Sequence, residues 1–288
     1  MPRTINPYSD FGFKRLFGSE ANKSLLIDFL NCLVLPEHQI ADLEFQPNDA
    51  LPTSTFERRA FFDLRCTATS GERFIVEMQK AKFHFFKDRA LFDATDPIKE
   101  QAERGDWDFK LQPVYFVAIL DFLYDEQVEK AKLLREVHLR DQDGETFSDK
   151  LHFRFVQMPA FQKTESELTT HFDKWCYFLK NLENFEVLPE ILREPVFEKG
   201  ISTLKEAALT KEELPSYEQS LKEQRDFTVF LREQVADGFA RGKAEGLAES
   251  KARGKAEALR DAARKMRELG LSWEAVTQAT GVRPEELG

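Results

Sequence analysis

The sequence predicts an α/β fold in which helices flank a mixed sheet and an all-helical C-terminal half follows. Three observations support this prediction. Apolar segments near 58–67, 72–80 and 111–122 have the length and composition of strands. Segments with apolar residues three and four positions apart precede and follow them, as in amphipathic helices. Apolar residues make up 42% of the 288 positions, which is enough for a sizeable core and too many for a disordered chain.

The first part of the chain is predicted to hold two helical pieces and a strand. Asp10 is expected to cap a short turn. Ser19 or Asn22 caps a longer helix whose leucines share one face, and Pro36 ends it. Residues 40–45 alternate apolar and polar side chains, which predicts a strand.

The centre of the chain is predicted to contain a hairpin and a buried strand. Residues 69–72, which read Thr-Ser-Gly-Glu, form the turn between strands 58–67 and 72–80. A helix over 84–104 follows, and Pro97 kinks or splits it. The near-continuous apolar run of 111–122 indicates a central strand buried on both faces.

The second half is predicted to extend the sheet and then become helical. Strands at 133–140 and 150–158 form a second hairpin. Apolar and aromatic residues recur at helical spacing over 165–182, which favours a helix that faces the core over a surface that stacks on bases. Further helices continue to about residue 233, with interruptions at Pro189, Pro195 and Pro215.

Two carboxylates interrupt the strands of the first hairpin. Alternation along a strand puts Glu77 and Gln79 on one face with Ile75, and Asp63 lies in the neighbouring strand. A carboxylate in an apolar strand costs several kcal/mol unless it is paired or binds a metal. Side by side, the two carboxylates would form a site for a divalent cation with oxygen ligands. The alternative is structural ion pairing, of Asp63 with Arg59 or Arg65 and of Glu77 with Arg73 or Lys80.

Asp63 followed by Glu77-x-Gln79 resembles the PD-(D/E)xK nuclease motif. Three further stretches sharpen the resemblance: DFGFKRLFG at 10–18, FFKDR at 85–89 and PVYFVAILDF at 113–122. Together they resemble the Rpn family of recombination-promoting nucleases, also described as putative transposases. The resemblance implies a restriction-endonuclease-like core and a Mg²⁺-dependent DNA endonuclease with a role in recombination or DNA transfer. Gln79 stands where the wider superfamily has a lysine, as it does in the Rpn group.

The metal hypothesis assigns a role to each residue of the motif. Asp63 and Glu77 ligate one Mg²⁺ or Mn²⁺, with the Met78 carbonyl as a third oxygen. Gln79 is neutral and is expected to orient the attacking water. The catalytic set is therefore Asp63, Glu77 and Gln79.

Several basic side chains are candidates for contacts with DNA phosphates. Lys80 lies on the opposite face of its strand from Glu77 and is no obvious replacement for the motif lysine. Near the N-terminus, the alternative is a packing arm that docks Phe11, Phe13 and Phe17 on the core. The candidate residues are Lys14, Arg15, Lys80, Lys82, Lys87 and Arg89.

The segment from Gly238 has a different composition. Small residues recur at every fourth position, as Gly238, Gly242, Gly246, Ser250, Gly254, Ala258 and Ala262. Residues 238–267 contain nine Lys or Arg and four Asp or Glu, which gives this segment a net charge of +5 in a chain whose total is −10. A helix this rich in glycine should be marginal alone, so an identical chain or DNA is the expected partner. Residues 266–287 read as a small helix-turn-helix, with a capping or dimerising tail as the alternative.

These features predict three parts: a nuclease-like core over 1–160, a helical region over 161–237 packed on it, and a basic helical tail over 238–288. Cys32, Cys66 and Cys176 lack metal-like spacing and are expected to be buried free thiols, which fits a reducing cytoplasm. Residues 1–20 lack the apolar run of a signal peptide, and no run is long enough to span a membrane.

Two other classes of function compete with the nuclease hypothesis. A non-catalytic DNA-binding or assembly protein would use the basic tail and would need no metal to bind. A serine or cysteine hydrolase is disfavoured because the sequence has no Gly-x-Ser-x-Gly elbow and no persuasive Cys–His pair.

Overall fold

The computed structural model describes residues 4–46, 61–82, 85–103, 108–124, 131–185, 187–205 and 209–287. The chain divides into two compact units, residues 1–225 and 226–288. The division into parts ending at residues 160 and 237 stays a prediction. Among the described residues, no helix combines the length and the apolar composition that crossing a bilayer requires.

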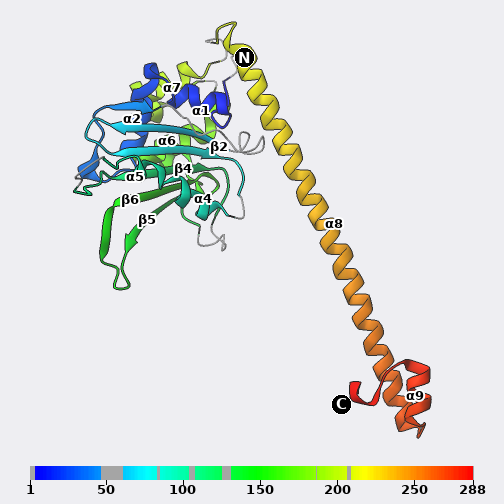
Figure 1. Ribbon diagram of the computed structural model, residues 1–288. Coiled ribbons are helices and arrows are strands. Elements are labelled where there is room, and N and C mark those ends of the chain that lie inside the picture. Colours follow the sequence, from blue (N-terminus) through cyan, green and yellow to red (C-terminus); the bar gives the residue numbers. More distant parts are fainter. Residues whose placement is uncertain are drawn as a thin grey trace. The chain divides into compact units, whose positions relative to one another are not determined.

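A mixed sheet forms the centre of the first unit, as predicted (Figure 1). The strands of the described residues lie in the order β1-β2-β3-β4-β6-β5. β3 and β4, and β4 and β6, run parallel, whereas the outer pairs are antiparallel. Every residue of β4 is buried, which is the pattern of a central strand covered on both faces. The strand bounds are β1 Leu43–Gln46, β2 Phe61–Ala68, β3 Arg73–Gln79, β4 Val114–Leu120, β5 Leu134–Arg140 and β6 Thr146–Gln157.

Helices cover both faces of this sheet (Figure 1). One face packs against α1 Asp10–Phe17, α2 Lys23–Asn31, α6 His171–Asn181 and α7 Pro195–Thr203, through a core that includes Phe74, Val76 and Met78 of β3. The other face carries Ile75 and packs against α4 Phe86–Asp93 and the residue after it, Ala94. Alternation along β3 therefore assigns Glu77 and Gln79 to the α4 face. The helix expected over 84–104 is split: α4 ends at Asp93 and α5 Asp96–Lys99 begins with Pro97 in its first turn.

Short 3-10 turns connect these elements, at Glu20–Asn22, Pro36–His38, Met158–Ala160, Glu165–Glu167, Leu182–Asn184, Glu190–Leu192 and Pro284–Glu286. The segment predicted as one helix over 165–182 begins with such a turn, and α6 starts only at His171, where Thr170 forms a capping box.

Two predictions about helix ends were wrong. The cap of α1 is Ser9, whose hydroxyl accepts a hydrogen bond from the Gly12 N–H at 3.0 Å, while Asp10 lies inside the first turn. Pro215 does not interrupt a helix, because it lies in the first turn of α8 Glu213–Glu268, where its missing N–H is not needed.

The second unit consists of the rest of α8, α9 Trp273–Thr280 and the last 3-10 turn. Side chains over 232–258 are exposed on every side, and a Cβ added at Gly238, Gly242, Gly246 or Gly254 would meet nothing within 4 Å. At the C-terminal end, Ala263, Val276 and Val282 form a small buried cluster. Gly270 and Gly281 turn the chain with φ values of 85° and 71°, as their positions between the predicted helices suggested.

The three cysteines are free thiols. Cys66 and Cys176 are buried, as expected, whereas Cys32 is only partly buried. Burial raises the pKa of Cys66 to about 12, so this thiol is inert at neutral pH.

Candidate active site

The hairpin of β2 and β3 brings the two motif carboxylates together. The Ala68 N–H donates to the Glu72 carbonyl at 2.8 Å and closes the turn. Along the ladder from this bond, the antiparallel register sets Asp63 opposite Glu77. Hydrogen-bonded pairs recur every second residue along an antiparallel ladder. Asp63 lies five residues, an odd number, from Ala68, so Asp63 and Glu77 form a non-hydrogen-bonded pair. Side chains of such pairs lie closest, with Cβ atoms roughly 5 Å apart.

Glu77 and Gln79 are buried side by side beneath α4. Glu77 is 4% exposed and Gln79 is 1% exposed. The Gln79 amide nitrogen donates to a Glu77 carboxyl oxygen at 2.5 Å. The other end of the amide, Gln79 Oε1, is buried without a hydrogen-bond partner in the part of the chain that the structure describes. A buried acceptor left open in this way indicates that a hydrogen-bond donor or a cation completes the site.

Burial raises the pKa of Glu77 to about 8. The negative charges of Asp93 and Asp63 contribute to this rise, whereas the Gln79 amide and the Arg89 guanidinium oppose it. Without a cation, Glu77 is therefore mostly protonated at neutral pH. A divalent cation would take the place of that proton.

Asp93, the last residue of α4, is a further acidic group that the sequence reasoning missed. Burial raises its pKa, the positive charges of Arg89 and Arg65 oppose the rise, and the charge of Asp63 adds to it. The spacing of Asp93 in the sequence could have revealed it. Asp93 lies seven residues after Phe86 and three after Ala90, which places it on the face of α4 that meets the sheet.

This donor set fits a hard divalent cation, because it offers carboxylate and amide oxygens in a buried site. Within the described ranges, no group of three His, Cys, Asp or Glu side chains is positioned to hold a metal. Ligation by Asp63 and Glu77 would therefore be completed by other oxygens. The Met78 side chain is buried in the opposite face of the sheet, so only its backbone carbonyl could be a metal ligand. Ligation by the Met78 carbonyl stays a prediction.

Two of the four ion pairs considered as the structural alternative do not form, because Arg65 and Arg73 pair with other carboxylates. Arg65 lies 3.6 Å from Asp96 and 3.5 Å from Glu100, and Arg73 lies 3.3 Å from Glu100. Arg59, the other partner considered for Asp63, lies outside the described residues.

The candidate phosphate-binding residues of the N-terminal region pack away from the motif. Phe13 and Phe17 are fully buried, and Phe11 packs against the same core, which supports the packing-arm alternative. Lys14 pairs with Asp10 at 2.7 Å. Arg15 pairs with Glu213 of α8 at 2.5 Å. Both basic residues line a groove of about 640 Å³ between α1 and the first turns of α8.

The other four candidates follow β3. Lys80 has its pKa lowered to about 8 by burial, against the charges of Asp121, Glu183 and Asp10. Lys82 donates to the Tyr124 carbonyl at 3.0 Å, and the Lys87 ammonium lies 5.3 Å from the centre of the Tyr124 ring. Arg89 belongs to α4 and lies beside Asp93, with 3.4 Å between the Arg89 Nε and an Asp93 carboxyl oxygen.

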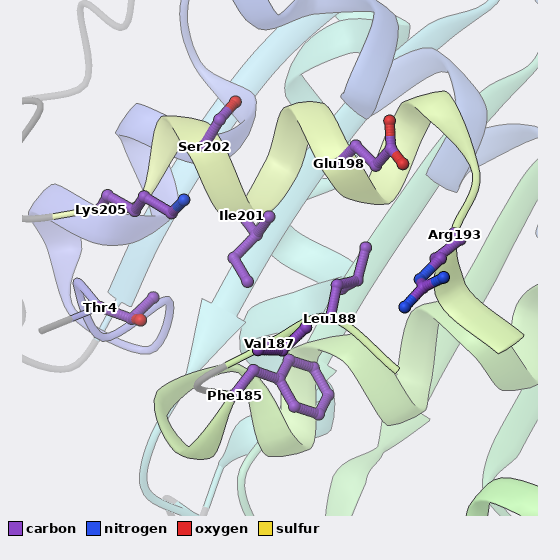
Figure 2. A pocket seen from close by; sticks show the side chains of 9 residues that line it. All are labelled: Thr4, Phe185, Val187, Leu188, Arg193, Glu198, Ile201, Ser202 and Lys205. Carbon is purple, nitrogen blue, oxygen red and sulfur yellow. The ribbon is translucent and has the colours of Figure 1, made fainter. Parts of the chain in front are cut away.

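A separate pocket of about 370 Å³ lies against α7 (Figure 2). Ile201 and Leu188 give it an apolar interior, and Arg193, Glu198 and Lys205 contribute charged groups. None of the motif residues lines it.

Comparison with protein families matches residues 7–234 to a family described as PD-(D/E)XK nuclease family transposase. The match spans the whole sheet, α4 and the first turns of α8. Comparisons with curated proteins and with solved structures find no match.

Proposed function

Because the chain belongs to the PD-(D/E)XK nuclease family of transposases, we propose that it is a metal-dependent endonuclease that hydrolyses phosphodiester bonds in DNA. The family predicted from Asp63, Glu77 and Gln79 is confirmed by the match. Nucleases of this superfamily generally use divalent metals, and we propose Mg²⁺ or Mn²⁺ for this chain.

The observation that supports this proposal best is the pairing of Asp63 with Glu77 beside an open amide oxygen. In the proposal, the two carboxylates hold the cation. A bound Mg²⁺ or Mn²⁺ supplies a Lewis acid for the phosphate and a lowered pKa for a water molecule. Gln79 Oε1 accepts a hydrogen bond from the attacking water and orients it, while the amide nitrogen of Gln79 keeps Glu77 in place.

Basic residues around the site would bind the DNA backbone. Lys82 and Lys87 gather at Tyr124, close in sequence to the motif strand and α4, so we assign them to phosphates on one side of the cleaved bond. Arg89 is nearer to the carboxylates. Lys14 and Arg15 would reach DNA only along the groove at α8, and Lys80 would do so from the opposite face of the sheet.

The proposed biological role is recombination or transfer of DNA, carried out in the cytoplasm. The tail from Gly238 is proposed as the surface through which copies of the chain associate or contact DNA. Its net charge of +5 over 238–267 and its fully exposed side chains over 232–258 support this assignment. The same observation favours the alternative function, a non-catalytic DNA-binding or assembly protein on a nuclease-like fold.

Metal-dependent nicking of supercoiled plasmid separates the two functions. The protein is incubated with plasmid in Mg²⁺, in Mn²⁺ and in EDTA. The enzyme should convert the plasmid in either metal and leave it intact in EDTA. Asp63→Asn and Glu77→Gln should remove the activity, whereas Glu44→Gln, which neutralises an exposed carboxylate on β1, should retain it. Plasmid binding without conversion in either metal would favour the alternative.

A further inference from the structure

Arg89 is held over the same face of the sheet as the motif residues. It belongs to α4, whose Phe86 and Ala90 pack in one cluster with Ile75 of β3. Its guanidinium is tied to Asp93 one turn later, with 3.4 Å between nitrogen and oxygen. The two side chains are 34% and 24% exposed, so the ion pair can be reached from solvent.

The described side chains nearest the motif are mostly negative or neutral. Asp63, Glu77 and Asp93 are acidic, and Gln79 is an amide. The charge of Arg65 also acts on Asp93, but Arg65 is paired with Asp96 and Glu100. The positive charge of Arg89 acts on both Glu77 and Asp93, lowering the pKa of each.

Hydrolysis of a phosphodiester needs positive charge near the phosphate oxygens, and the motif residues supply none. The phosphodiester is an anion, and further negative charge develops on its oxygens as the water attacks. A cation held by two carboxylates is largely neutralised by them. A guanidinium presents several N–H donors in a plane that matches two phosphate oxygens.

We propose that the Arg89 guanidinium, positioned by Asp93, binds a non-bridging oxygen of the phosphodiester that is cleaved and stabilises the charge that develops there. This inference rests on the proposed nuclease function. In the reaction the water oxygen forms a bond to phosphorus, the bond from phosphorus to the leaving oxygen breaks, and a proton from the water passes to solvent or to the leaving oxygen. Arg89 remains protonated throughout. Arg89 is thus a catalytic residue and Asp93 a positioning residue.

The test measures single-turnover nicking of supercoiled plasmid by Arg89→Gln in saturating Mn²⁺. The rate should fall about 100- to 1000-fold, as for loss of one charged or hydrogen-bonding group at the reacting oxygens. Mn²⁺ binding, followed by electron paramagnetic resonance, should be retained or tighter, because a neighbouring positive charge has been removed. Plasmid affinity in Ca²⁺ should change less than tenfold. The matched control is Lys99→Gln, which removes an exposed cation from α5 and should cut at the wild-type rate.

A second variant tests whether the loss of activity in Arg89→Gln is caused by the loss of a positive charge. Position 79 shares the strand face of Glu77, so a lysine there brings an ammonium to the same site. Arg89→Gln combined with Gln79→Lys should recover at least tenfold of the lost rate. Asp93→Asn should lower the rate less than Arg89→Gln does. Its remaining activity should depend on Arg89, so that adding Arg89→Gln brings it to the rate of Arg89→Gln alone.

The outcomes separate this inference from the proposed function. If wild-type protein does not nick plasmid in Mg²⁺ or Mn²⁺, the proposed function fails. If wild-type protein is active and Arg89→Gln is equally active, the inference alone is overturned. If Arg89→Gln is not folded by circular dichroism, Arg89→Lys carries the test: it should stay within about tenfold of wild type, and a larger loss in a folded protein that binds Mn²⁺ would contradict a role for the charge.

Discussion

The affinity of the protein for Mn²⁺ is expected to rise with pH between about 6 and 8. The cause is Glu77, whose pKa is about 8 in the protein without a cation. A cation binds the ionised carboxylate, so it must displace the proton first. About one Glu77 side chain in a hundred is ionised at pH 6 and about half are at pH 8, which predicts a gain in apparent affinity of about 50-fold.

Isothermal titration calorimetry measures this linkage directly. Titrations with Mn²⁺ in two buffers of different ionisation enthalpy give the number of protons released for each ion bound. That number should be close to one at about pH 6.5 and should approach zero by about pH 9.5. Glu77→Gln should bind weakly, with little release. An affinity independent of pH, with no proton released, would refute the assignment of Glu77 as a ligand.

The same group makes stability depend on pH in the protein without metal. The folded pKa of about 8 lies above the ordinary value of 4.5, so between these values the folded state binds more protons than the unfolded state. The free energy of unfolding therefore falls as pH rises, and the contribution of Glu77, on the order of 5 kcal/mol, is complete below pH 4.5 and lost above pH 8. Burial also raises the pKa of Asp93, Asp121 and Glu183, which act in the same direction. Urea unfolding of wild type and Glu77→Gln across this range isolates Glu77, and equal slopes for the two proteins would contradict the reasoning.

Three further predictions concern the motif and the tail. Asp63→Ala and Glu77→Ala should each abolish plasmid nicking while circular dichroism shows a folded protein; wild-type rates in either variant would show that the site is elsewhere. Gln79→Ala should slow nicking by about 10- to 1000-fold, the range for one positioning group. Gln79→Lys should still bind Mn²⁺ in a calorimetric titration, since a lysine stands at this position in the wider superfamily. A chain ending at Asp237 should stay soluble and active, because the side chains over 238–258 are exposed, yet it should bind DNA with a shallower salt dependence in filter binding or sediment as a smaller species. An insoluble or inactive truncated chain would contradict this separation.

The pairing of the motif residues could be predicted from sequence because a short turn fixes it. Four residues, 69–72, join the two strands, so the register of Asp63 against Glu77 follows from the turn and from the face that each strand buries. The central strand was equally predictable, since β4 is apolar along its whole length.

The contribution of α4 to the site could not be predicted in the same way. Arg89 and Asp93 reach the carboxylates only because α4 lies across the sheet, and that placement depends on packing of Phe86 and Ala90 rather than on local sequence. Arg154 is a second case. It is fully buried on β6, where its Nε donates to the Leu33 carbonyl at 2.8 Å and lies 3.3 Å from a Glu136 carboxyl oxygen, while its Nη2 has no hydrogen-bond partner among the described residues. Leu33 lies 121 residues before Arg154, and a reading of strand alternation does not find such a contact.

The two outer strands of the sheet bear on how copies of the chain can associate. An outer strand with free backbone groups is a template on which a strand of another molecule can add. β1 has four residues, and β5 carries Arg135, Glu136 and Arg140 and shifts register against β6 near its C-terminal end. A short strand on one side and a charged, irregular strand on the other disfavour growth of the sheet from molecule to molecule. The sheet is thereby protected against aggregation, and ordered self-association is left to surfaces outside it.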